Sequence, residues 1–161
     1  MSAPKPSFTS RSPKLSFVHA TVAAAFEAGD PLAHAKEPER GLVDVVQQVF
    51  AALGRGDIDA FMSYFADDVV LDLHVPGEFE FRKYAEGAKE ARELVLGNFQ
   101  LLESQAPQIT GLVAQGDTVM LTLQEIGVIR ATGQPYSIQA AMQFTFRGGK
   151  IWRFNEIVAL A

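Results

Sequence analysis

The hydrophobic pattern of the chain changes at Pro107, and this change constrains the fold more than any other feature of the sequence. Before Pro107 apolar residues recur at helical spacing, and after it they alternate with a period of two. The alternation covers four strand-like segments, 108–117, 118–133, 135–149 and 150–160, which are separated by turns that contain glycine. Helices followed by a long antiparallel meander predict an α+β domain, with helices packed on one face of a bent sheet.

Three helices are predicted before this point. The first spans 37–57 and has one continuous apolar face, and the second spans 58–65 with Asp57 as its N-cap. The third spans 88–104. Its inward-facing residues are predicted to be Ala91, Leu94, Val95, Phe99 and Leu102.

The stretch FADDVVLDLHVPG, residues 65–77, combines a strand-like alternation with polar residues that raise the question of catalysis. The apolar residues of one phase are Val69, Leu71, Leu73 and Val75. A half-buried strand turns its apolar phase to the core, so Asp72 and His74 are predicted to face outward or toward a dimer partner. A bulge near Pro76 would instead turn His74 toward the pocket. A short second strand and a loop are predicted over 78–87.

Length and composition exclude several classes of protein. The 161 residues suffice for one well-buried domain, and a hydrophobic content of 48% with 20% charged residues is that of a globular chain. A net charge of −5 favours neither nucleic acid nor an anionic membrane as partner. No apolar run is long enough to span a bilayer, and the absence of cysteine is consistent with a reducing compartment. We therefore expect a cytoplasmic location.

The first 38 residues differ in composition from the rest of the chain. They begin with a Ser-, Pro-, Lys- and Arg-rich stretch, and a short helix is predicted over 15–29. A signal peptide and an organelle transit peptide are alternatives. We expect an N-terminal extension, flexible or partly helical, over 1–38 and a folded domain over 39–161.

Three motifs in the folded part carry a family resemblance. They are GDIDAFMSYFADDV at 56–69, EGAKEA at 86–91 and FTFRGGKI at 144–151. In this order they resemble the SnoaL-like and ketosteroid-isomerase-like families of the nuclear-transport-factor-2-like, or cystatin-like, superfamily. The resemblance implies a conical half-barrel around an apolar pocket, usually in a homodimer. It does not imply one activity, because the scaffold carries isomerases, cyclases, dehydratases, epoxide hydrolases and non-catalytic binding proteins.

The isomerase activity can be examined at single positions. Alignment with the family places Leu73 at the general-base aspartate, Val49 at the oxyanion-hole tyrosine and Met142 at the second oxyanion-hole acid. None of these side chains can accept or donate the required proton. Steroid isomerisation by the family mechanism is therefore not expected.

Two glutamates interrupt the apolar phases of their strands. Glu125 lies in phase with Val119, Leu121 and Leu123, and Glu156 lies in phase with Phe154 and other apolar residues of 150–160. The family alignment also places both on the pocket side. A carboxyl among apolar groups has a raised pKa and makes a candidate general acid or base. The alternative is that Glu125 and Glu156 form ion pairs with arginines at the sheet edge, the candidates being Arg130, Arg147 and Arg153.

The catalytic candidates are thus Glu125, Glu156 and His74. The candidate ligand-binding residues are Tyr64, Leu73, Tyr84, Met142 and Phe154. The three histidines are scattered, so no metal site is expected, and no motif indicates a cofactor. One hypothesis is cofactor-independent acid–base chemistry on a small apolar molecule: isomerisation, cyclisation, dehydration or hydrolysis. The alternative is a non-catalytic ligand-binding or dimeric assembly module.

Overall fold

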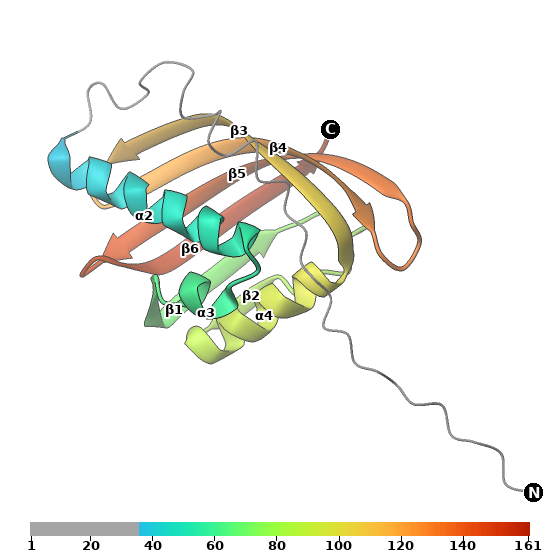
Figure 1. The fold of residues 1–161 in the computed structure, drawn as a ribbon, viewed down its shortest axis with the longest axis horizontal. Coiled ribbons are helices and arrows are strands. Elements are labelled where there is room, and N and C mark those ends of the chain that lie inside the picture. Colours follow the sequence, from blue (N-terminus) through green and yellow to red (C-terminus); the bar gives the residue numbers. More distant parts are fainter. Residues whose placement is uncertain (1–35) are drawn as a thin grey trace, which may run out of the picture.

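The computed structural model describes residues 36–161, which fold as helices packed against one sheet (Figure 1). The expected extension over 1–38, with its helix over 15–29, lies almost wholly outside the described residues. The helices are α2 (Glu37–Gly54), α3 (Ile58–Met62) and α4 (Ala88–Gln100). The strands are β1 (Phe65–His74), β2 (Tyr84–Glu86), β3 (Leu102–Gln115), β4 (Thr118–Ile129), β5 (Pro135–Arg147) and β6 (Lys150–Leu160). This arrangement confirms the predicted α+β class.

All six strands form a single sheet in the order β2-β1-β6-β5-β4-β3. The last four strands form the predicted antiparallel meander. The curved antiparallel sheet is confirmed, with one exception: β1 lies parallel to β6, with Leu73 opposite Glu156. A parallel neighbour needs a long connection, and residues 75–149 lie between these two strands.

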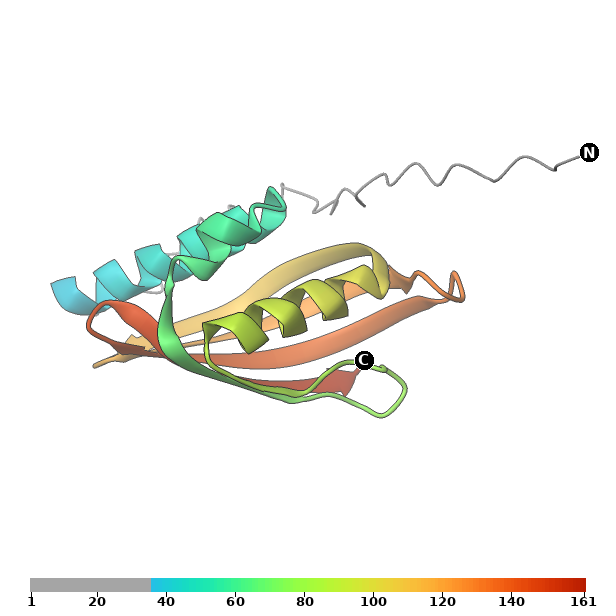
Figure 2. The ribbon, with the colours of Figure 1, turned by 90° about the horizontal axis from the view of Figure 1, so that it is seen from below.

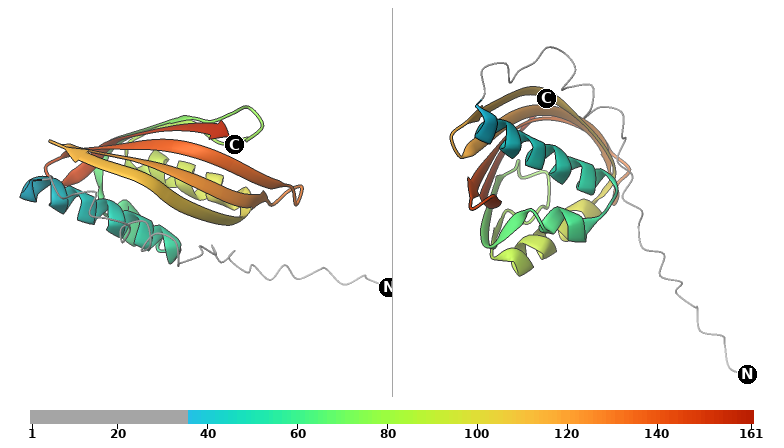
Figure 3. Two further views of the ribbon diagram at one scale, coloured as in Figure 1. Left: turned by 90° about the horizontal axis from the view of Figure 1, so that it is seen from above. Right: turned by 60° about the vertical axis from the view of Figure 1, so that its left-hand side comes forward.

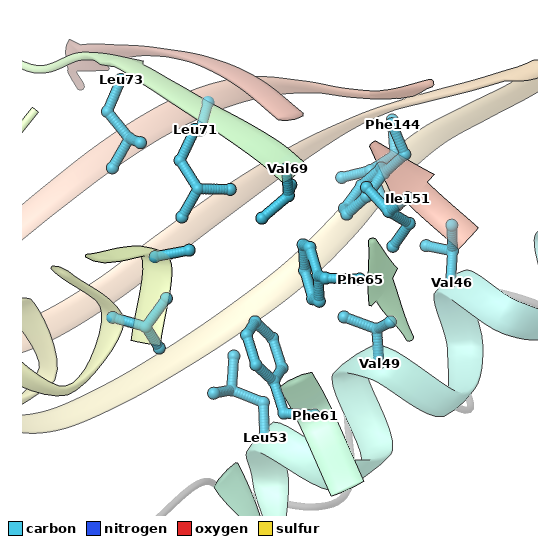
Figure 4. Packing of buried hydrophobic residues seen from close by; sticks show 14 of the residues in the cluster. Val46, Val49, Leu53, Phe61, Phe65, Val69, Leu71, Leu73, Phe144 and Ile151 are labelled. Atoms are coloured by element: carbon cyan, nitrogen blue, oxygen red, sulfur yellow. The ribbon is translucent and has the colours of Figure 1, made fainter. Parts of the chain in front are cut away.

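The sheet bends around the helices, which all lie on its concave side (Figures 2 and 3). Buried side chains of β1 and α2 point toward one another in the interior, among them Leu71, Leu73, Val49 and Leu53 (Figure 4). The predicted inward phase of β1 is therefore confirmed. The register of β1 against β6 shifts between Phe65 and Val70, whereas a bulge that turned His74 inward would have to lie near Pro76.

The last hairpin shows how the sequence sets the strand register. Arg147 pairs with Lys150, so only Gly148 and Gly149 form the turn, and both have positive φ, 58° and 77°. A two-residue hairpin of this kind needs positive φ at both turn positions, which glycine adopts at little cost. The predicted Gly-Gly turn is thus confirmed.

The third helix is shorter than predicted. It ends at Gln100, and Leu102 already pairs with Ile129 as the first residue of β3. Arg130 explains the early end, because its guanidinium donates hydrogen bonds to the carbonyls of Gln100 and Leu102 at 2.9 and 2.7 Å. These side-chain donors replace the hydrogen bonds that a further helical turn would have supplied. The second helix also ends early, at Met62, because Phe65 begins β1.

Candidate functional site

A cavity of about 160 Å³ lies between the concave face of the sheet and the helices. An apolar cavity of roughly 150 Å³ can hold a benzene ring, so this space suits a small ring-sized molecule. Eight phenylalanines and one tyrosine line it: Phe50, Phe61, Phe65, Phe79, Phe81, Phe99, Phe144, Phe154 and Tyr136. Four polar or charged residues besides the tyrosine reach its wall, Asn98, Gln105, Glu125 and Glu156. The cavity is therefore an apolar chamber with few polar groups.

Both glutamates that interrupt the strand phases lie on the cavity wall. Glu125 pairs across the sheet with Ile138, and Glu156 pairs with Met142. One row of apolar residues, Leu123, Ala140 and Val158, separates the two carboxyl-bearing rows. The two carboxyls thus lie at different positions along the cavity, with this apolar row between them.

Three apolar residues that the family resemblance aligns with catalytic residues of the isomerases also line the cavity, namely Leu73, Val49 and Met142. The alignment therefore selected positions that face the cavity, and all three side chains lack an acidic or donor group. Phe154, predicted to bind a ligand, lines the cavity as well.

A chain of hydrogen bonds holds Glu125 in place. The Tyr136 hydroxyl donates to Glu125 Oε1 at 2.6 Å, and the Gln105 amide donates to the Tyr136 oxygen. Gln105, Gly127 and Tyr136 lie opposite one another on β3, β4 and β5. A Cβ on Gly127 would lie 2.5 Å from the Tyr136 ring, so the absence of a side chain at Gly127 lets the ring cross β4. The chain thus runs from Gln105 through Tyr136 to Glu125.

Burial and hydrogen bonding shift the pKa of Glu125 in opposite directions. Desolvation raises the pKa of its carboxyl, while the hydrogen bond from Tyr136 lowers it, and desolvation is the larger effect. Burial and the nearby carboxyl of Glu125 also raise the pKa of Tyr136, so this hydroxyl keeps its proton and acts as a donor.

Glu156 has no hydrogen-bond or ion-pair partner among the described residues. Desolvation is the main cause that raises its pKa to about 7, and the negative charge of Glu125 adds to the effect. The residue retains some accessible surface, and its side chain borders the cavity. Its carboxyl can therefore exist in both protonation states near neutral pH.

The alternative of edge ion pairs finds no support in residues 36–161. Arg130 contacts the backbone after α4, and Arg147 pairs with Asp68 on the protein surface. No ion pair within this range involves Glu125 or Glu156.

The structure does not bring His74 to the cavity, which corrects the expectation that it acts beside the glutamates. Its side chain is exposed on the outer face of β1, with Nε2 3.5 Å from Asp72 Oδ1. The strand keeps its alternation to its last residue, so His74 points away from Leu73 and Val75.

The two tyrosines predicted to bind a ligand also lie outside the cavity wall. Tyr64 is half-buried in the turn after α3 and packs against the core. Tyr84 lies on the edge strand β2, is 49% exposed and donates a hydrogen bond to Glu86. Tyr136 is the tyrosine that lines the cavity.

Tyr136, Gln105 and Asn98 were missed as polar wall residues. Tyr136 lies in the apolar phase of its strand, and Gln105 follows directly after the segment predicted as helix. Asn98 is structural, because its Nδ2 donates to the Arg82 carbonyl and its Oδ1 accepts from the Arg82 amide, both at 2.9 Å. Only the strand pairing shows that Tyr136 crosses Gly127.

Within residues 36–161, no group of three or more His, Asp or Glu side chains lies close enough together to hold a metal ion. No helix in the same part of the chain is long and apolar enough to cross a membrane.

A curved sheet that encloses an apolar cavity beneath three helices is the architecture of the nuclear-transport-factor-2-like fold. The family model described as the SnoaL-like domain matches residues 46–154, and the chain belongs to this family. No curated protein sequence matches the chain significantly.

Solved structures show the same fold at low sequence identity. An NTF2-like protein from Burkholderia xenovorans LB400 is 22% identical, with a TM-score of 0.63 over 75% of this chain and 91% of that one. A protein of Jannaschia sp. CCS1 described as a SnoaL-like polyketide cyclase is 15% identical, with a TM-score of 0.65 over 76% and 88%. An LEH-like epoxide hydrolase of M. tuberculosis is 15% identical, with a TM-score of 0.59 over 76% and 85%.

Proposed function

We propose that the chain binds a small, largely apolar molecule in the cavity and catalyses a proton transfer on it without a cofactor. The observation that carries the proposal is the position of Glu156, a carboxyl without a side-chain partner among residues 36–161, on the wall of a largely apolar cavity. A group whose pKa lies near the working pH serves well as both general acid and general base.

The two glutamates have different roles in this proposal. Glu156 takes a proton from substrate carbon or water and returns it to substrate carbon or oxygen. Glu125, held by Tyr136, contributes a negative charge that adds to the desolvation by which the pKa of Glu156 is raised. Such a step occurs in isomerisation, cyclisation, dehydration and hydrolysis. The cyclase and the epoxide hydrolase among the structural neighbours support this range of reactions through fold likeness.

A generic base probe tests the proposal without knowledge of the natural substrate. Removal of the C3 proton of 5-nitrobenzisoxazole breaks its N–O bond and yields a coloured cyanophenolate, with no second reactant. We expect turnover that rises with pH with a midpoint near 7 and falls on the order of 100-fold in Glu156→Gln. Glu103→Gln, an exposed change on β3, is the control. Full activity in Glu156→Gln would refute the proposed base.

The alternative, a non-catalytic binding or assembly module, would be favoured by a filled interior or by glutamates engaged in surface ion pairs. The cavity volume and the lack of an ion pair to Glu125 or Glu156 in the described part support the catalytic proposal instead.

We also propose a homodimer formed through the outer face of the sheet, as the family resemblance implies. Four exposed apolar side chains support it, Val113, Met120, Ile126 and Ile157. They lie on the outer face because their strand neighbours face the core or the cavity. Light scattering should give a dimer mass for the wild type and a monomer mass for Ile157→Glu. A wild-type monomer at micromolar concentration would contradict this assembly. A cytoplasmic location stays a prediction.

A further inference from the structure

The part of the cavity wall formed by residues 36–161 carries acidic groups and no basic side chain to balance them. Among the described residues that line it, the titratable groups are Glu125, Glu156 and Tyr136, and none is Lys, Arg or His. Glu125 receives a hydrogen bond from a neutral hydroxyl, and Glu156 receives none from the described residues. An unpaired buried carboxylate is costly, so a ligand that supplies the missing positive charge would gain affinity from both groups.

The surroundings of Glu156 suit a cation that is partly apolar. Phe154 precedes it by two residues on the same face of β6, and Phe144 lies opposite Phe154 on β5. Their ring centroids are 5.0 Å apart. Aromatic rings attract organic cations through their negative faces, and Tyr136 and Phe79 form a second ring pair beside Glu125.

We propose that the cavity takes a small apolar amine in its protonated form. The ammonium group pairs with Glu156, the carboxyl that has no partner within residues 36–161, and the negative charge of Glu125 stabilises the ammonium further. The apolar part of the ligand lies against the phenylalanine rings. This inference names a ligand class for the cavity and rests on the binding part of the proposed function, because it requires that the cavity bind a small molecule.

The same features make other ligand classes less suited to the cavity. A carboxylate or phosphate ligand would meet two acidic groups and, among the described wall residues, no cationic side chain. A sugar-like molecule would leave many hydroxyls unpaired against phenylalanine, which costs affinity. A neutral apolar molecule fits the volume but gains nothing from Glu156.

Three ligands of nearly equal size test the proposal by calorimetry on the full chain at pH 8. Benzylamine is a cation at this pH, benzyl alcohol is neutral and benzoate is an anion. We expect benzylamine to bind at least about tenfold more tightly than benzyl alcohol, because a charge-assisted hydrogen bond replaces a neutral one. Benzoate should not bind detectably.

Binding measurements on variants identify the carboxyl that produces the preference for benzylamine over benzyl alcohol. Glu156→Gln should weaken benzylamine about tenfold or more and leave benzyl alcohol unchanged. Glu125→Gln should weaken benzylamine binding less than Glu156→Gln does, and the exposed Glu103→Gln should leave benzylamine binding unchanged. In the wild type, benzylamine affinity should rise between pH 6 and 8 as Glu156 ionises, and this rise should disappear in Glu156→Gln.

Three outcomes overturn the inference in distinguishable ways. If benzyl alcohol binds as tightly as benzylamine, the cavity does not select cations, while the proposed binding of small molecules stands. If neither binds and 5-nitrobenzisoxazole is not turned over, the proposed function fails together with the inference. Equal weakening of both ligands in Glu156→Gln also overturns it, because that result shows a loss of shape and not of charge.

Discussion

The ring of Tyr136 lies across the backbone of Gly127, its partner on the neighbouring strand, and this placement brings its hydroxyl to Glu125. A Cβ at Gly127 would lie 2.5 Å from the Tyr136 hydroxyl and 2.4 Å from the Ser104 carbonyl oxygen. The hydrogen bond that holds one of the two cavity carboxyls therefore depends on the absence of a side chain one strand away.

Gly127→Ala should destabilise the protein by about 1–3 kcal/mol, because the methyl group forces the ring or the backbone to move. Urea denaturation measures the change. Gly97→Ala is the matched control, since Gly97 lies exposed within α4 and nothing lies within 4 Å of an added Cβ. It should stabilise by roughly 0.5–1 kcal/mol through helix propensity. Equal stability of Gly127→Ala and the wild type would show that the ring does not occupy this space.

Tyr136→Phe should raise the pKa of Glu125, because it removes the hydrogen bond that lowers it and leaves desolvation unopposed. Carbon-13 NMR of the side-chain carboxyls would follow the titration directly. The change should also cost about 1–2 kcal/mol of stability, because Gln105 loses its acceptor in a buried setting. An unchanged Glu125 titration would contradict the hydrogen bond as a determinant of its charge.

Glu156→Gln should change how stability depends on pH. Between pH 4.5 and about 7 the folded protein holds a proton on Glu156 that the unfolded chain has released. The free energy of unfolding of the wild type therefore falls as pH rises through this window and levels off above it. The variant lacks this contribution. Its free energy of unfolding relative to that of the wild type should therefore increase by up to about 3 kcal/mol between pH 5 and pH 8.

Thermal and urea denaturation at both pH values measure this difference, with Glu103→Gln as the surface control. A variant that gains as much stability at pH 5 as at pH 8 would show that packing, and not the proton on Glu156, causes the effect.

Asn98→Ala should loosen the cavity wall that includes Phe79 and Phe81. Its amide makes two hydrogen bonds to the backbone of Arg82, so the loss should cost about 2–3 kcal/mol. Faster hydrogen exchange at the Arg82 amide would locate the change. Asp68→Asn removes a surface contact to Arg147 and should have a much smaller effect. Unaltered exchange at Arg82 would refute this role for Asn98.

The alternation of apolar and polar residues within each strand was sufficient to predict that both glutamates face the cavity. The apolar phase of each strand puts Glu125 and Glu156 on the inner face without knowledge of which strands pair. The same rule placed His74 outside, and the bulge that would have reversed it is absent from that end of β1. The turn glycines likewise marked the ends of the hairpins.

The hydrogen-bond chain could not be predicted in the same way. That Gln105, Gly127 and Tyr136 share a row depends on the register of three strands, which no single segment encodes. The pattern around Leu102 continues the helical spacing, and only the side chain of Arg130 from a distant turn explains why α4 ends first. The parallel pairing of β1 with β6 was missed because it depends on the path of the whole chain.

The titratable groups of the cavity all belong to strands β4, β5 and β6, whereas the helices contribute apolar side chains and Asn98, whose amide is engaged by Arg82. Substitutions at helix positions such as Phe50, Leu53 or Phe99 can therefore enlarge or reshape the chamber while the hydrogen bond from Tyr136 to Glu125 stays intact. A set of helix variants on one unchanged sheet would accept ligands of different size with the same protonation chemistry. Ligand size and acid–base behaviour can thus be varied separately in this protein.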